Sequence, residues 1–269
     1  MPALRPYEVV AHNTATTSTN KIHDDEVARR YGFGGGLVPG VDVYAYMTHP
    51  AAEAWGVDWL EHGTMRARFL APVYEGDRVT VVPGDPLDTA TGPVAGLEVR
   101  NGSGDLCAVG EAGLLDLPGE PPEVTWPVAA PVDERPPASP DALVPGTALG
   151  LAPHRFVADR SADYLAEVRE DLALYRDAGV AHPGWLLRDA NTVLSASVVL
   201  GPWIHVESVV RHHGVVRDGD AVEARATVAR EWENKGHRFV ELDVGLIADE
   251  RLVAHVCHTA IYQPRVERA

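Results

Sequence analysis

The 269-residue chain carries one pattern twice, on either side of a stretch crowded with proline. Residues 71–84 read APVYEGDRVTVVPG and residues 214–228 read GVVRDGDAVEARATV, and their Gly-Asp pairs begin 143 residues apart, at Gly76 and Gly219. Upstream, LVPGV at residues 37–41 has a counterpart in AHPGW at residues 181–185. A repeat of this length indicates duplication of a whole domain rather than a solenoid of short units.

The proline-rich stretch divides the two copies. Residues 116–146 read DLPGEPPEVTWPVAAPVDERPPASPDALVPG. Proline lacks an amide donor and fixes φ, so such a segment cannot hold a helix or an inner strand. It is typical of a semi-rigid, extended connection. We therefore expect an N-terminal unit at 1–117, a linker at 118–150 and a C-terminal unit at 151–269.

Both units show the same order of expected elements. Short helical patterns at 24–33 and 163–179 precede the Pro-Gly pairs, and longer helices follow at 41–48 and 184–199. In the 163–179 pattern, Leu165, Val168, Leu172 and Tyr175 share one helical face. Alternating strands follow at 94–100 and 106–115, and again at 222–228, 240–246 and 252–262. A central helix wrapped by a curved antiparallel sheet is the α+β arrangement called a hotdog, so we predict a double hotdog.

Composition restricts the partners of this chain. Asp and Glu outnumber Lys and Arg by 39 to 23, a net charge of −16, which disfavours nucleic acid and anionic membrane. No apolar run approaches the ~20 residues of a transmembrane helix, and the first residues lack the apolar core of a signal peptide. Two cysteines and no Cys-x-x-Cys exclude a disulfide framework and a zinc finger. We expect a cytoplasmic protein without a metal.

The stretch that carries chemistry begins with Asn20-Lys21-Ile22-His23-Asp24-Asp25. Ala28, Gly32-Phe33 and Leu37-Val38-Pro39-Gly40 follow it. This spacing resembles the hydratase motif of the MaoC-like, R-specific enoyl-CoA hydratase family. The resemblance places the catalytic histidine on His23 and the oxyanion-hole glycine on Gly40. It also places the family's asparagine on Asn20, a hydroxyl residue on Thr48 and a later aspartate on Asp25.

The motif departs from the family at several positions. The catalytic aspartate, five residues before the histidine, is Ser18 here, the proline after the asparagine is Lys21, and the histidine before the glycine is Pro39. A serine is neither an acid nor a base at pH 7, and loss of a general acid/base costs ~10²–10⁴ in rate. The carboxylate can come from elsewhere, one proton-transfer group can suffice, or the site only binds.

The remaining residues agree with thioester chemistry. Gly40 precedes a helix, whose first amides are unpaired and partly positive and suit an enolate oxygen. His23 titrates near neutral pH and can move a proton. We expect Val38, Pro39, Tyr44 and Asp25 to contact substrate. Structural roles stay open for the site residues. These roles are a helix cap or surface position for His23, a tight loop at Gly40, a turn residue at Asn20, a loop serine at Ser18, core positions for Thr48 and Tyr44, and a first-turn carboxylate at Asp25.

The resemblance implies a hydro-lyase that adds water to, or removes it from, the Cα–Cβ bond of an acyl thioester. His23 would be the acid/base, Gly40 the oxyanion donor, and CoA or an acyl carrier protein the carrier, with no metal or redox cofactor. The second unit has no histidine at the position of His23, so we expect it to supply a wall of the site. We also expect a homodimer. The alternatives are another reaction on the same fold (isomerisation, elimination or cyclisation) and a non-catalytic acyl-binding subunit.

Overall fold

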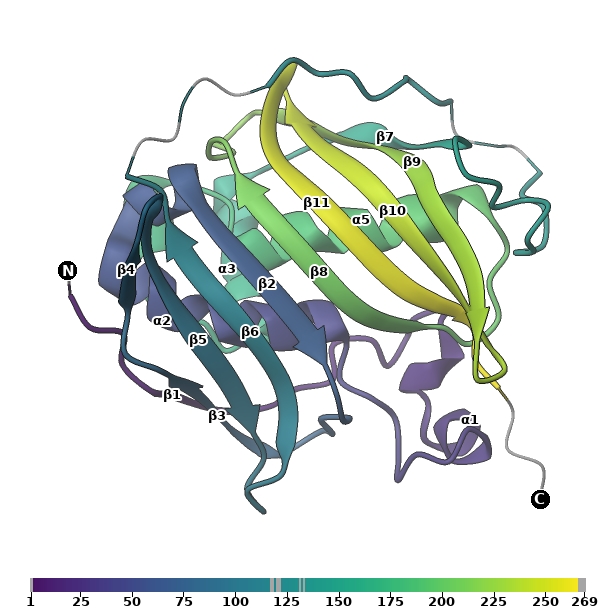
Figure 1. Ribbon diagram of the computed structural model, residues 1–269, viewed down its shortest axis with the longest axis horizontal. Coiled ribbons are helices and arrows are strands. Elements are labelled where there is room, and N and C mark those ends of the chain that lie inside the picture. The colour runs from purple at the N-terminus through teal and green to yellow at the C-terminus, as the bar shows by residue number, and fades with distance from the viewer. Residues whose placement is uncertain (1, 117–118, 120–121, 131, 133, 266–269) are drawn as a thin grey trace.

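The fold is built on one antiparallel sheet that runs through both units (Figure 1). The computed structural model describes residues 2–116, 119, 122–130, 132 and 134–265. Its strands follow one another in the spatial order β1-β3-β5-β6-β2-β8-β11-β10-β9-β7, and β4 pairs with β5. The N-terminal strands are β1 (Tyr7–Val10), β2 (Gly63–Phe69), β3 (Arg78–Pro83), β4 (Leu87–Thr89), β5 (Gly92–Arg100) and β6 (Leu106–Leu114). The C-terminal strands are β7 (Ala148–Arg155), β8 (Ile204–His212), β9 (Ala221–Asn234), β10 (His237–Ala248) and β11 (Arg251–Gln263).

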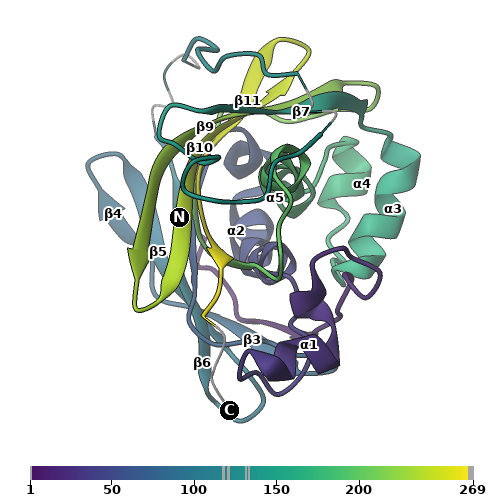
Figure 2. The same cartoon turned by 90° about the vertical axis from the view of Figure 1, so that its right-hand side faces the viewer.

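Two long helices lie inside the curve of this sheet. Figure 2 shows α2 (Gly40–His62) and α5 (Pro183–Ser197) side by side against its concave face. The smaller helices, η1 (Lys21–His23), α1 (Asp25–Arg30), α3 (Ala158–Glu167) and α4 (Leu174–Ala178), lie on the open side. Tyr44, Met47, Trp59, Leu187 and Leu194 are fully buried between helices and sheet. This is the predicted α+β double hotdog. Across the described ranges, none of the helices combines the length and apolar character that a bilayer-spanning segment requires.

The repeat read from the Gly-Asp pairs is visible as two turns with the same hydrogen bonds. The Asp77 carboxylate accepts from the Tyr74 amide, and the Asp220 carboxylate accepts from the Arg217 amide, both at 2.9 Å. Gly76 and Gly219 have φ of 79° and 90°, a conformation that costs glycine little. The strand pairing β2–β8 then joins the two units at the middle of the sheet.

The two Pro-Gly pairs differ by one residue from the 143-residue spacing of the Gly-Asp turns. The Val38 amide donates to the Val73 carbonyl at 2.8 Å, and the Ala181 amide donates to the Val216 carbonyl at 2.9 Å. Each residue of the second hydrogen bond stands 143 residues after its counterpart in the first. The residue equivalent to Gly40 in the repeat is therefore Pro183, not Gly184. The residue opposite His23 is then Ala166, and the second unit has no histidine there.

The single helix predicted at 163–179 is wrong. The chain forms α3 and α4, separated by Arg169 at φ 56°. The Glu170 amide donates to the Leu165 carbonyl and the Arg169 amide to the Ala166 carbonyl, as in a Schellman ending. This turn sends the Glu170 carboxylate into the core, where it bonds the His49 ring and the Leu172 amide. A helix usually ends this way at glycine, so arginine gave no signal.

The described residues of the proline-rich stretch contain neither helix nor strand. Trp126 packs on Gly245 of β10, and Pro137 forms an isolated bridge with Val199. The segment therefore crosses the C-terminal unit as an extended strap (Figure 1). Strand β7 begins at Ala148, three residues before the boundary expected for the second unit.

Candidate active site

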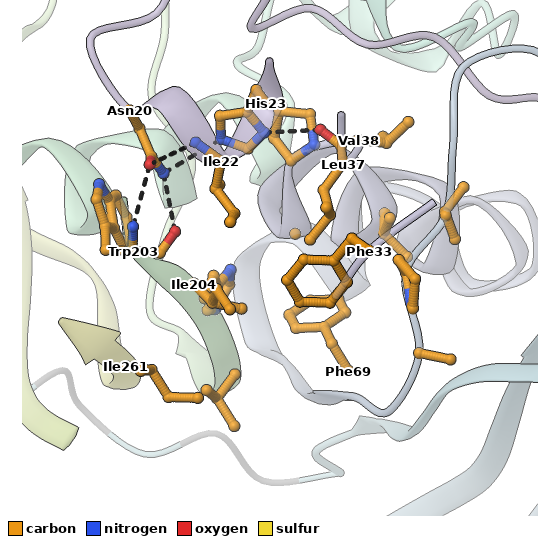
Figure 3. A pocket seen from close by; sticks show the side chains of 18 of the residues that line it. Asn20, Ile22, His23, Phe33, Leu37, Val38, Phe69, Trp203, Ile204 and Ile261 are labelled. Atoms are coloured by element: carbon orange, nitrogen blue, oxygen red, sulfur yellow. Dashed lines mark hydrogen bonds between the residues drawn. The ribbon is translucent and has the colours of Figure 1, made fainter. Parts of the chain in front are cut away.

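A cavity of about 280 Å³ opens where the first turn of α2 meets the start of β8 (Figure 3). The N-terminal unit supplies the segments before α2 and after β2, and the C-terminal unit supplies α5, β8 and β11. Most of the wall is apolar. Its apolar lining includes Ile22, Phe33, Leu37, Val38, Pro39, Val43, Phe69, Pro72, Val73, Trp203, Ile204 and Ile261. Such a lining suits a small acyl group.

His23 is held at this wall by two hydrogen bonds that fix its tautomer. Its Nδ1–H donates to the Leu37 carbonyl at 2.7 Å. The Asn20 side-chain oxygen accepts from the Trp203 and Ile22 amides, so the Asn20 nitrogen is the group 3.3 Å from His23 Nε2. That nitrogen also donates to the Trp203 carbonyl at 3.0 Å. In Figure 3 Asn20 lies between His23 and Trp203. Nε2 therefore carries the lone pair, as a general base requires.

Burial sets the protonation state of His23. The loss of water around the ring lowers the pKa of His23 below its usual value, although the bond to Leu37 and the charge of Asp42 oppose this. The neutral form therefore dominates at pH 7. A proton taken up by Nε2 is held weakly and is readily given back.

Gly40, which also lines the cavity, begins α2. The residue before it, Pro39, makes no side-chain cap, and the Gly40 amide has no hydrogen-bond partner among the described residues. A Cβ on Gly40 would lie 2.8 Å from Nδ1 of His205. Glycine is thus required for the approach of β8, and the helix N-terminus stays open to the cavity.

Among the lining residues that sequence reasoning did not choose, two carry a buried polar atom without a partner in the described part of the chain. His205 of β8 is 6% exposed, and Asn191 of α5 carries a buried side-chain oxygen; neither Asn191 Oδ1 nor His205 Nδ1 has a partner in the described part of the chain. The sequence pattern predicted no role for His205. Alternation along the strand shows which face a residue takes but not that this face lies against α2. No sequence signal linked Asn191 to the site.

Besides His23 and Gly40, three predicted residues line the cavity and a fourth lies next to it in the chain. Asn20, Val38 and Pro39 belong to the lining. Ser18 lies one loop away, where its Oγ accepts from the Asn20 amide at 3.1 Å. The family aspartate position is therefore occupied by a residue that orders the Asn20 loop.

The other three predicted residues lie outside the lining. Thr48 is fully buried and donates to the Ala45 carbonyl at 2.7 Å. Tyr44 is fully buried in the same helix. Asp25 opens α1, where its carboxylate accepts from the Gly36 amide at 2.8 Å and fixes the loop that leads to Leu37. The structure thus gathers His23, Asn20, Val38, Pro39 and Gly40, and gives these three residues contacts elsewhere.

Potential metal-binding side chains gather away from the cavity. None of the described lining residues carries a carboxylate or a thiol. Within the described ranges, groups with closely spaced ligating atoms are Asp243 with His255 and Cys257, and His49 with Glu170 and Asp171. The chemistry open to the cavity is therefore that of imidazole, amide and backbone N–H groups.

Solved structures of other proteins share the fold of this chain, although no sequence comparison finds a match. No protein-family model and no curated protein sequence matches the chain. A protein described as a MaoC domain dehydratase from Chloroflexus aurantiacus superposes with TM-score 0.65 at 12% identity, over 98% of this chain and 95% of its own. A conserved protein from Mycobacterium tuberculosis, described as a double hotdog, gives 0.63 at 15% identity over 97% and 96%.

Thioesterases share this architecture. A protein described as an oleoyl thioesterase from Lactobacillus plantarum gives TM-score 0.56 at 10% identity, over 98% of both chains. Identities this low show the fold alone. The chain is therefore similar in structure to MaoC-like dehydratases and to thioesterases, and it has the double-hotdog fold.

Proposed function

We propose that this chain processes acyl thioesters, by adding water to, or removing it from, the Cα–Cβ bond. One observation carries the proposal: the base nitrogen of His23 and the unpaired N-terminal amide of α2 belong to the same apolar cavity. Hydration of an enoyl thioester needs a base for water and a donor for the enolate oxygen, and it needs both beside an apolar acyl group.

A single proton-transfer group is sufficient in this mechanism. Water takes the place of the Asn20 side-chain amide as the hydrogen-bond donor to His23 Nε2. This nitrogen then accepts a proton from the water as the water oxygen bonds to Cβ. The electron pair of the double bond moves to the thioester oxygen, which accepts a hydrogen bond from the Gly40 amide. The imidazolium then delivers its proton to Cα as the enolate collapses, so the elements of water are added and His23 returns to its neutral form. No lining carboxylate is needed, consistent with serine at position 18.

A groove beside the cavity favours CoA as the carrier. It measures about 520 Å³ and shares Val206, His237 and Ile261 with the cavity lining. Arg68, Arg230 and Lys235 line it together with Glu207 and Glu241, and Arg230 pairs with Glu241 at 3.1 Å. Trp232 stacks on Phe239 at 5.1 Å, and the Arg230 guanidinium lies over the Trp232 ring. In a chain with net charge −16, a groove with three cations against two carboxylates is locally less acidic, and its cations and aromatic rings suit phosphates and a base.

The direct test is turnover of trans-2-enoyl-CoA thioesters of short and medium length, followed by loss of the conjugated-thioester absorbance. We expect hydration by the wild type and a rate lower by about 10²–10⁴ in His23→Ala. His213→Ala is the matched control, because His213 lies outside the cavity lining. Folded protein without turnover on any chain length contradicts hydration, and tight binding without turnover would favour an acyl-binding subunit.

A further inference from the structure

The second polar wall of the cavity contains a histidine that the mechanism above does not use. His205 begins the part of β8 that faces Gly40, and its ring packs edge-on against Phe69 at 4.7 Å. The side chain is 94% buried (6% exposed), it lines the cavity, and its Nδ1 has no partner among the described residues. Because Nδ1 also lies closest to the missing Cβ of Gly40, it is near the open end of α2.

The other ring nitrogen of His205 enters a buried chain of hydrogen bonds. Its Nε2 lies 2.8 Å from Ser208 Oγ, which lies 3.0 Å from Nδ1 of His258. Ser208 and His258 are direct partners in the β8–β11 pairing, and both are completely buried. The hydroxyl has one proton, so it donates to one ring and accepts from the other. Only two arrangements of protons are then possible.

The two arrangements differ in where an unpaired N–H is left. If the serine donates to His258, the unpaired N–H is Nε2–H of His258, which is 0% exposed and has no acceptor in the described part of the chain. If the serine donates to His205, the unpaired N–H is Nδ1–H of His205. This atom is buried as well, but His205 lines the cavity and His258 does not. An orphaned buried N–H is costly, and only the second arrangement places it where a bound ligand can accept, so the second arrangement is favoured.

Both rings are neutral. Burial, and in second place the neighbouring His258, lowers the pKa of His205 well below its usual range, although a hydrogen bond to the Glu207 backbone opposes this. Burial lowers the pKa of His258 to about 3. A neutral imidazole is a donor of fixed direction rather than a source of protons, and such a donor can stabilise developing charge without being deprotonated.

We propose that His205 is a catalytic residue of the proposed reaction: its Nδ1–H and the Gly40 amide together bind the thioester oxygen. Ser208 and His258 are positioning residues that hold the Nδ1–H tautomer. No proton leaves His205 at any step. The enolate oxygen forms between two donors, one from each unit of the chain, while His23 alone moves the proton. This inference rests on the proposed function for the identity of the oxygen, but not for the tautomer.

The tautomer is measured without substrate. In protein labelled with ¹⁵N-histidine, two-bond ¹⁵N–¹H correlations report which ring nitrogen carries the proton, and His205→Gln identifies the His205 signals. We expect Nδ1–H at His205 and at His258, and in Ser208→Ala we expect His205 to lose its single tautomer. Nε2–H at His205 in the wild type overturns the proposal, whatever the activity.

The oxyanion role is read from a bound chromophore. In His23→Ala, whose turnover should be slower by about 10²–10⁴, bound 2,4-hexadienoyl-CoA should absorb at longer wavelength than free ligand, because donors at the thioester oxygen polarise it. Adding His205→Leu should remove most of this shift with less than a threefold change in Kd, whereas adding His213→Leu should leave it. In the otherwise native enzyme, His205→Leu should lower kcat by about 10²-fold.

The outcomes separate the two proposals. An unchanged shift in the His205→Leu double variant overturns the role of His205 and leaves the proposed function standing. Failure of every variant and of the wild type to bind the thioester contradicts the proposed function, and the tautomer measurement then still decides whether His205 presents Nδ1–H. If His205→Leu does not fold, Ser208→Ala in the same background takes its place, and a smaller shift is again expected.

Discussion

The N-termini of the two central helices occupy equivalent places in the repeat, but only one of them has a side-chain cap. At α2, Pro39 makes no side-chain cap, and Gly40, whose amide has no partner among the described residues, lines a cavity. At α5, the equivalent residue is His182, whose Nδ1 accepts from the Gly184 amide at 2.9 Å, and Pro183 has no amide to offer. One helix end is left open to a ligand, whereas the other has its donors used or removed.

The space in front of each helix differs in the same way. A Cβ on Gly184 would lie 2.3 Å from the Tyr164 hydroxyl, and Tyr164, Tyr175 and His182 are all buried there. The Glu170 carboxylate, bonded to His49 at 2.9 Å and 3.5 Å from His182 Nε2, closes the region from the other side. In the second unit, core side chains thus fill the place equivalent to the proposed site, consistent with a proposed site in the first unit only.

The largest effect is expected from a methyl group at the open helix end. Gly40→Ala places a Cβ 2.8 Å from His205 Nδ1 and disturbs the oxyanion position, so kcat/KM should fall by about 10²-fold or more. Gly184→Ala is the matched change at α5. It should lower the melting temperature through the clash with Tyr164 and leave kcat/KM of the folded protein within about threefold. Equal losses of activity in both variants would contradict the comparison.

The pH profile tests the base at the open end. Because burial lowers the pKa of His23, its neutral form persists below the usual histidine value of about 6.5. kcat/KM should be flat through pH 7 and fall tenfold per pH unit only in acid, below that value. An acid limb centred above pH 6.5 would show that His23 is not the group that titrates.

The capped N-terminus of α5, which we call the closed end, should contribute to the free energy of unfolding and not to the rate of hydration. In His182→Ala, α5 loses its cap and Glu170 loses a partner, so the free energy of unfolding should fall by at least about 1 kcal/mol. Denaturant unfolding measures the loss, and hydration assays on folded protein should show little change. A large loss of kcat with unchanged stability would mean that α5 contributes directly to catalysis.

Acid should weaken the closed end through Glu170. Burial alone would raise the pKa of Glu170, but hydrogen bonds and charge from His182 and His49 outweigh it and hold the pKa below its usual range. A carboxyl with a depressed pKa in the folded state stabilises the protein above its unfolded pKa of about 4.3 and loses this contribution as pH falls further. Unfolding midpoints should therefore drop below pH 4 in the wild type and less in Glu170→Gln. Parallel curves would contradict this.

The smallest effect is expected from Ser18→Asp, which introduces the aspartate that the hydratase motif has at this position. Ser18 lies outside the cavity lining and bonds the Asn20 amide, so Ser18→Asp should change kcat/KM by less than about threefold. Ser18→Ala is the matched control for the bond to Asn20. A large gain in rate with aspartate would show that position 18 reaches the substrate.

How far sequence reasoning reached depended on whether a signal was local. The Gly-Asp turns, the strand alternation and the NKIHDD…PG spacing are local, and they predicted the double hotdog and a cluster around His23, Asn20 and Gly40. The break at Arg169 had no local signal, because the inward turn of Glu170 answers to His49, 121 residues away. His205 entered the site only through the contact of β8 with α2, which joins the two units. The difference between Pro39 and His182 looks minor until the register shows that they precede equivalent helices, where only His182 makes a side-chain cap.

The central claim is that the acyl thioester binds at the open end of α2 and not at α5. A crystal structure of His23→Ala with bound trans-2-enoyl-CoA tests it most directly. The account predicts the thioester oxygen within hydrogen-bonding distance of the Gly40 amide and His205 Nδ1, the acyl chain among Phe33, Phe69 and Ile261, and the nucleotide along Arg68 and Trp232. A thioester bound beside His182, or one whose oxygen points away from Gly40, would contradict it.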